Sequence, residues 1–133
     1  MLQQHQVEVA RVNQFKTEQL DGIELLIVGS PTRAFRPTKA ITNLIKSLPD
    51  QKLVGMNVAT FDTRVSVTDI NNKILNIMVR IFGYAAEPIA KGLVKKGGNL
   101  VAPAEGFYVT GTKGPLKDGE LEHAKDWAFR LIS

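Results

Sequence analysis

Hydrophobic and polar positions change their spacing along the 133-residue chain, and these changes predict four strands. Apolar and polar residues alternate over 7–12, which is typical of a half-buried or edge strand. The continuous apolar run 25–28 predicts a strand that is covered on both faces. A Val- and Met-rich stretch at 52–60 predicts a third strand, and 100–109 predicts a fourth that a proline and a glycine interrupt.

Apolar residues at helical spacing predict helices between these strands, each bounded by capping or breaking residues. The expected helices lie between Thr38 and Pro49, between Asp69 and Gly83, between Pro88 and Gly97, and along the stripe Leu121, Ala124, Ala128 and Leu131. Strands that alternate with helices pair in parallel through crossover connections. The predicted fold class is therefore α/β: a single domain, residues 1–133, with an open parallel sheet and helices on both faces.

Composition excludes several functional classes. The chain is 44% hydrophobic, has no cysteine and has a formal charge of +4. These values predict a globular domain without disulfides or thiolate metal sites, and no run approaches the ~20 apolar residues of a membrane span. The first residues lack the pattern of a secretion signal. Because the basic residues are spread along the chain, we expect no nucleic acid as partner. The absence of cysteine suits a reducing compartment, so we expect a cytoplasmic domain, and we expect no membrane as partner.

The candidate chemistry lies in two polar segments that follow predicted strands. Residues 30–36 and 61–66 each combine hydroxyl groups, an arginine and an aromatic ring. In open α/β sheets, ligands bind beyond the carboxyl ends of the strands. Hydroxyls and backbone N–H groups can bind the edge of a flat heterocycle, an aromatic ring can stack on its face, and an arginine can balance an anion. A purely structural interpretation stays open, in which Pro31 and Thr32 form a turn and Arg33 is solvated.

Acid–base or nucleophilic catalysis has little support in this sequence. Of the two histidines, His5 lies near the chain start and His123 on the last predicted helix, and both are expected at the surface. No serine is paired with either in the sequence, and the spacing typical of metal ligands is absent. Whether the protein is an enzyme stays open, and an electron carrier or a binding module is favoured.

Four stretches together resemble the flavodoxin family, and more narrowly its small flavodoxin-like domains in bacteria and archaea. They are LLIVGSPTRAFRPT, ATFDTRVS, GYAAEPIAKGLVKKGGNLVAPAEGFYV and GPLKDGELEHAKDWA, and they cover most of the chain from residue 7 onward. The resemblance implies a five-stranded parallel sheet of order 2-1-3-4-5, non-covalently bound FMN, and electron transfer to a redox partner protein that the sequence does not identify.

The resemblance also assigns the residues that would hold the isoalloxazine ring. By position, they are Ser30, Pro31, Thr32, Arg33 and Phe35 in one loop and Phe61, Asp62, Thr63 and Arg64 in the other. Phe35 is the better candidate for stacking on the ring. Phe61 would point into the core instead if the strand before it extended that far.

The chain departs from the family at its N-terminal side. The family's phosphate loop follows an apolar first strand and has a pattern like Thr/Ser-x-Thr-Gly-Asn-Thr, which is absent here. By resemblance, residues 7–12 correspond to the second strand of the family, and the first strand and the phosphate loop are missing. The VTGTKG stretch at 109–114 imitates that loop but is expected to be a turn. Without helix N-terminal N–H groups for the phosphate, we expect FMN to bind weakly or not at all.

Loss of the first strand leaves unpaired backbone groups that the fold has to satisfy. We favour direct pairing of residues 7–12 with 24–28, with a homodimer as the second choice; a strand supplied by a separate peptide stays open. For function, FMN-linked electron transfer comes first. The alternative is a cofactor-free binding or structural module, or a truncated gene product, that keeps the flavodoxin scaffold. An enzyme acting on a phosphorylated or nucleotide substrate has little motif support.

Overall fold

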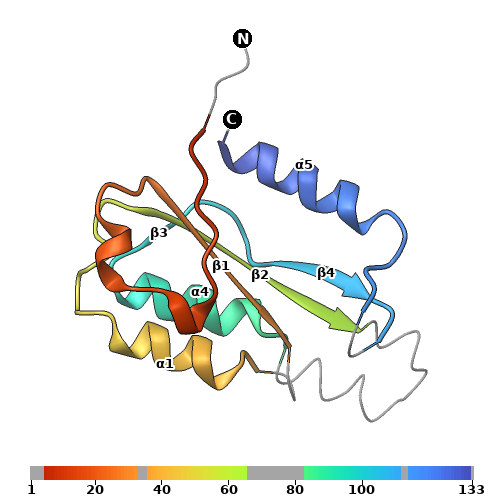
Figure 1. Cartoon of the computed structure of the whole chain (residues 1–133), viewed down its shortest axis with the longest axis horizontal. Coiled ribbons are helices and arrows are strands. Elements are labelled where there is room, and N and C mark those ends of the chain that lie inside the picture. The colour runs from red at the N-terminus through yellow and green to blue at the C-terminus, as the bar shows by residue number, and fades with distance from the viewer. Residues whose placement is uncertain (1–4, 33–35, 66–82, 112–113, 133) are drawn as a thin grey trace.

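A computed structural model describes residues 5–32, 36–65, 83–111 and 114–132 (Figure 1). The fold is α/β, with a four-stranded open sheet whose strands pair in parallel. Two short 3-10 helices precede the first strand. The elements are η1 (Val12–Gln14), η2 (Thr17–Leu20), β1 (Leu25–Pro31), α1 (Lys39–Ser47), β2 (Asn57–Val65), α4 (Ala86–Lys95), β3 (Asn99–Leu100), β4 (Glu105–Val109) and α5 (Glu120–Ile132).

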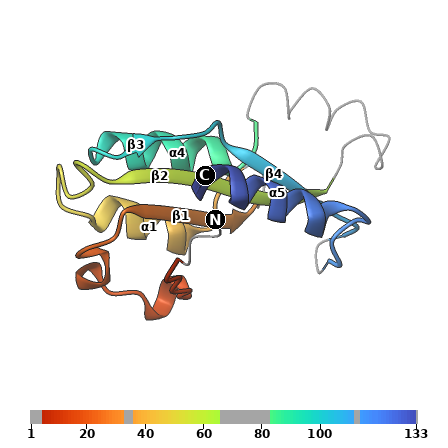
Figure 2. The ribbon, with the colours of Figure 1, turned by 90° about the horizontal axis from the view of Figure 1, so that it is seen from above.

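Strand β2 is the centre of the sheet. It pairs with β1 along seven residues on one side, from Leu25↔Asn57 to Pro31↔Thr63. On its other side it pairs first with β3 and then with β4. The predicted fourth strand is thus divided into two pieces, and the break contains Pro103 as expected, whereas Gly106, which was also expected to interrupt it, lies within β4. Among the described residues, no strand pairs with the other side of β1, which is the outer edge of the sheet in Figure 2.

Helices α1 and α4 cover one face of the sheet, where the larger core cluster lies. Thr38 is the N-cap of α1, and its side chain accepts a hydrogen bond from the Ile41 N–H at 3.4 Å. The predicted α1 is confirmed, since Ile41 and Ile45 are buried one turn apart. The two helices approach closely because Gly92 of α4 leaves room for the Ile45 side chain, which an added Cβ would approach to 2.8 Å.

Helix α5 covers the opposite face, so helices lie on both faces as predicted (Figure 1). The smaller core cluster there joins Ala59, Phe107 and Trp127. The predicted stripe of α5 is wrong in part, because Leu121 is 61% exposed while the buried residue is Trp127. The large indole fills the space between the helix and the sheet and therefore sets which side of α5 faces the core.

Two predicted strand boundaries are wrong. Residues 51–55 form turns, and β2 begins only at Asn57 and continues to Val65. The segment 61–64, which was expected to form a polar loop after the strand, is therefore part of the strand itself. Leu53 is nevertheless fully buried, which explains why its surroundings resembled a strand in the hydropathy pattern. The helix predicted between Asp69 and Gly83 lies outside the described residues.

The strand predicted at 7–12, and its pairing with 24–28, are also wrong. Residues 5–11 form no strand, and the valines that alternate there are largely solvated: Val7 is 77% exposed and Val9 is 93% exposed. Val12 begins a 3-10 helix and packs against the core on the α1 side. Alternation alone does not make a strand, because an extended segment needs a neighbour that accepts its hydrogen bonds.

Candidate functional site

The carboxyl ends of β1 and β2 lie together with the start of α4 at one end of the sheet (Figure 1). We call residues 30–32, 62–64 and 84–86 the carboxyl rim. Seven of the nine predicted ring-binding residues are described: Ser30, Pro31, Thr32, Phe61, Asp62, Thr63 and Arg64. Arg33 and Phe35 lie outside the described residues.

Hydrogen bonds join the carboxyl end of β1 to the starts of α1 and α4. The buried Ser30 hydroxyl donates to the Pro31 carbonyl at 2.9 Å and accepts from the Thr38 N–H at 3.1 Å, which joins the strand to the start of α1. The Thr32 N–H donates to the Thr63 carbonyl at 2.9 Å, and its Oγ1 accepts from the Ala85 N–H at 3.2 Å. The Ser-Pro-Thr segment therefore positions the starts of α1 and α4.

Asp62 is the most deeply placed charged residue of the rim, with no exposed surface. Its two carboxylate oxygens accept from Nε and Nη2 of Arg64 at 2.6 and 2.7 Å, in a bidentate pair. Oδ2 also accepts from the Ala86 N–H at 2.9 Å. A carboxylate at this position satisfies a donor that the first turn of a helix leaves open, and it interacts favourably with the helix dipole. Buried charge is tolerated here because every partner is in place.

Arg64 is held between β4 and a tyrosine. Its guanidinium carbon lies 3.6 Å from the centre of the Tyr84 ring, which is a cation–π contact. On the other side the guanidinium lies against Gly106 of β4, where an added Cβ would overlap it. Burial raises the pKa of Tyr84 above its ordinary value of 10.0, although the positive charge of Arg64 acts in the opposite direction.

Phe61 and Thr63 alternate with Asp62 and Arg64, so their side chains lie on the α5 face of β2. Phe61 packs against Phe107 and Trp127, with ring centroids 5.8 and 5.9 Å away, which confirms that it points into the core. Its ring also lies over Gly29 of β1, where no other residue would leave room. Phe61 and Arg64, both assigned to one ring-binding loop, therefore face opposite sides of the sheet.

Sequence reasoning missed Tyr84 and the N–H groups of Ala85 and Ala86. The signal was present in the GYAAEP stretch, because Pro88 lacks an N–H and is favourable in a first helical turn. Ala85 and Ala86 have no polar side chain to cap α4. Their N–H groups instead donate to Thr32, which directly follows β1, and to Asp62 of β2.

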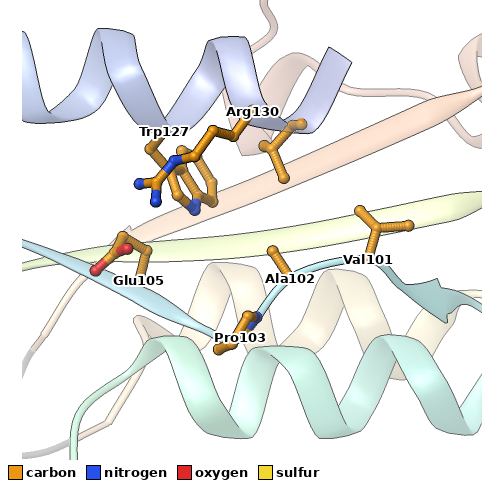
Figure 3. A pocket seen from close by; sticks show the side chains of 7 residues that line it. Val101, Ala102, Pro103, Glu105, Trp127 and Arg130 are labelled. Carbon is orange, nitrogen blue, oxygen red and sulfur yellow. The ribbon is translucent and has the colours of Figure 1, made fainter. Parts of the chain in front are cut away.

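A pocket of about 280 Å³ lies elsewhere, between α5 and the segment that joins β3 to β4 (Figure 3). It is lined by Val101, Ala102, Pro103, Glu105, Trp127, Arg130 and Leu131. None of the nine predicted site residues lines it. This pocket forms because the residues between β3 and β4 do not continue the sheet under α5.

The remaining predicted features have separate outcomes. Residues 112 and 113 of the VTGTKG stretch lie outside the described residues; of its other residues, the Gly114 N–H donates to the Gly111 carbonyl at 3.0 Å and the Thr110 N–H donates to the Pro115 carbonyl at 2.9 Å. His123 is half-buried rather than fully at the surface, with Nδ1 3.2 Å from Glu120 Oε1.

Within the described ranges, no three His, Asp or Glu residues gather closely enough to hold a metal ion, and no helix there is long and apolar enough to cross a bilayer.

Comparison with protein-family models and with curated proteins finds no match to this chain. The function of the carboxyl rim is therefore inferred from the chemistry of its residues. Its described polar groups are mutually satisfied: no buried side-chain nitrogen or oxygen in the described part of the chain is without a partner. The rim offers a rigid polar wall with a stacked arginine–tyrosine pair. It offers no described arginine or lysine aimed at a phosphate, because Arg64 is paired with Asp62.

Proposed function

We propose that this protein is a flavodoxin-like domain that binds the ring of a flavin at the carboxyl rim and takes part in electron transfer. The observation that carries the proposal is the joining of three segments at that rim. Thr32 bonds to Ala85 and Asp62 bonds to Ala86, so β1, β2 and α4 form one preorganised wall. Ligands of open parallel sheets bind at this end of the strands.

The chemistry of the wall supports a planar, uncharged ring. The guanidinium carbon of Arg64 lies 3.6 Å from the centre of the Tyr84 ring, and the guanidinium is fixed by two hydrogen bonds to Asp62. Arg64 thereby fixes the Tyr84 ring, and a fixed aromatic ring loses little entropy when it stacks against a flat heterocycle. Bound FMN would supply a group that accepts and releases electrons, and the residues of the rim would hold and orient it. The half-buried Tyr84 would limit the access of water on that side.

The phosphate of FMN is the group that the described rim fits least well, and it therefore provides the most decisive test. The described rim holds no cluster of free backbone N–H groups and no unpaired cation for a dianion. We therefore expect riboflavin, which lacks the phosphate, to bind within about tenfold of FMN, a difference below about 1.4 kcal/mol. Titration followed by flavin fluorescence measures both constants. A preference for FMN of several orders of magnitude would show that another part of the chain binds the phosphate.

A second candidate is a cofactor-free binding or structural module on the same scaffold. It is favoured by the internal use of Asp62, whose carboxylate is buried and bonded to Arg64 and Ala86. In this function the rim serves stability alone. The absence of any saturable change with either flavin up to about 1 mM, near the weakest affinity that is useful, would favour the module and exclude the flavin proposal.

A further inference from the structure

The pocket between α5 and the segment that joins β3 to β4, here called the α5 pocket, contains a polar group that the described chain does not satisfy. Trp127 is only 7% exposed, and no described residue accepts a hydrogen bond from its indole N–H. Because no fully buried side-chain nitrogen of the described residues lacks a partner, this nitrogen has to reach open space. Figure 3 shows it on the part of the ring that points away from α5, toward Ala102. A buried ring thus holds a hydrogen-bond donor at the pocket.

Two side chains of opposite charge also line the α5 pocket. Arg130 comes from the last turn of α5, and Glu105 is the first residue of β4. No ion pair joins the two, and no described residue pairs with the Arg130 guanidinium. Glu105 Oε1 accepts from the Gly106 N–H at 3.2 Å and lies 3.7 Å from Nε2 of His123, whereas no described group bonds to Oε2. The pocket therefore presents an unpaired guanidinium and a carboxylate with a free oxygen.

The rest of the pocket wall is apolar. Val101, Ala102 and Pro103 line it from the segment between β3 and β4, and Leu131 lines it from α5. Val101 is 40% exposed, so part of this wall contacts water. The volume of about 280 Å³ lies just below the ~300–1,000 Å³ of most ligand clefts. An occupant of this pocket is therefore a small molecule, and an apolar group on it would be removed from water on binding.

We propose that the α5 pocket binds a small zwitterion with an apolar tail, the chemistry of an apolar α-amino acid. The carboxylate of the ligand accepts hydrogen bonds from the Arg130 guanidinium and from the Trp127 indole N–H. Its ammonium group donates to Glu105, and its tail lies against Val101 and Leu131. The site is separate from the carboxyl rim and does not depend on the binding of a flavin there.

The two opposite charges of the pocket favour a zwitterion over a ligand with a single charge. A simple carboxylate would bind to Arg130 and the indole N–H, but it would lie near the negative charge of Glu105, which disfavours binding. An amine alone would bind to Glu105 and would leave the guanidinium and the indole N–H without an acceptor. A molecule that carries both groups satisfies all three.

The first test compares three small ligands on the whole, unaltered chain. Trp127 is the single tryptophan, so its indole N–H gives one resonance in a nitrogen–proton NMR spectrum. L-leucine is expected to shift this resonance, with half-saturation at or below about 1 mM. Isocaproate, which lacks the ammonium group, and isoamylamine, which lacks the carboxylate, should each bind at least about tenfold more weakly.

Three results of this comparison would overturn the proposal. The first is a lack of saturation with leucine up to about 10 mM. The second is equal binding of leucine, isocaproate and isoamylamine. The third is a saturating shift of other resonances while the indole resonance stays in place, because leucine would then bind outside the α5 pocket. None of these results depends on a substituted chain, so the comparison stays decisive if a variant folds poorly.

The second test removes each charge in turn. Arg130→Gln should weaken leucine binding at least about tenfold, because a hydrogen bond between two charged groups is lost. The matched control is Arg36→Gln, which changes another exposed arginine that does not line the pocket and should leave leucine binding unchanged. Glu105→Gln keeps an acceptor for the Gly106 N–H and should reduce the preference for leucine over isocaproate by about tenfold. Wild-type binding by Arg130→Gln, or a wild-type preference in Glu105→Gln, would overturn the proposal.

Discussion

The two sides of β1 contrast sharply. On its inner side and at its carboxyl end the polar groups are hydrogen-bonded: Ser30 bonds to Thr38, and Thr32 bonds to Thr63 and Ala85. Its outer side presents backbone groups that no described residue satisfies. The inner side of β1 is therefore bonded to β2, and its carboxyl end to the starts of α1 and α4, whereas its outer side is the edge of the described sheet. The contrast indicates that substitutions on the inner side should have the larger effects on stability.

The largest expected loss on the inner side comes from Asp62→Ala. The change leaves the Arg64 guanidinium without its bidentate partner and the Ala86 N–H without an acceptor. Removing one partner of a buried pair costs about 3–5 kcal/mol. Because Arg64 keeps some solvent access, we expect about 3 kcal/mol. Urea unfolding measures it, and a double variant with Arg64→Met should recover part of the loss. A stability change below about 1 kcal/mol would show that the rim does not depend on this pair.

The next effect is expected from Gly29→Ala, within the sheet. The new methyl group would overlap the ring of Phe61, which has to leave its place between Phe107 and Trp127. Overpacking of this kind costs about 1–3 kcal/mol. Gly111→Ala is the control, since an added Cβ there meets no atom within 4 Å. Comparable melting temperatures for the two variants would contradict the packing seen around Phe61.

A smaller loss is expected from Thr32→Val. The variant keeps the shape of the side chain and removes the acceptor of the Ala85 N–H at the start of α4. Losing a helix-terminal acceptor costs about 1 kcal/mol. Thermal unfolding measures the change, and Thr110→Val, whose hydroxyl bonds to Pro115 at an exposed turn, is the matched control. Equal losses in both variants would mean that Thr32 does not support α4.

The smallest effect concerns Tyr84 and alkaline pH. Burial raises its pKa in the folded state above 10.0, so the folded protein keeps a proton that the unfolded chain has lost. Its contribution to stability is therefore complete below about pH 10 and is lost as the pH rises through the folded-state pKa. In a Tyr108→Phe variant, absorbance of the remaining tyrosinate should appear at higher pH than in the urea-unfolded chain. If Tyr84 loses its proton at the same pH in the folded and the urea-unfolded chain, the partial burial of its ring would be contradicted.

The comparison also explains what the sequence could predict. The helix after Thr38 and the helix near Pro88 were predicted correctly, because burial on one face leaves a periodic pattern. The strand at 25–28 was also predicted, but its expected burial on both faces was wrong, because β1 ends the described sheet and Ile27 is 40% exposed. The segment 61–64 was predicted as a turn, because a charged pair inside a strand is exceptional. The burial of Asp62 is favourable because the N-terminus of α4, which is distant in sequence, donates a hydrogen bond to its carboxylate.

The misplaced strand at 7–12 has a different cause. Its alternation is a local property, whereas pairing requires a partner that local sequence does not specify. Trp127 was missed on α5 for a similar reason, since several faces of that helix carry apolar residues and the sheet determines which of them is buried. The two ring-binding loops were assigned by position, and position does not indicate that Phe61 and Arg64 face opposite sides of β2.

Trp127 gives the molecule a built-in optical reporter. It is the single tryptophan of the chain, and it lies between α5 and the hollow beside β4 (Figure 3). Its emission therefore responds to the docking of α5 on that face. Comparing its emission with far-ultraviolet circular dichroism would distinguish detachment of this one helix from cooperative loss of the whole domain, without any added label.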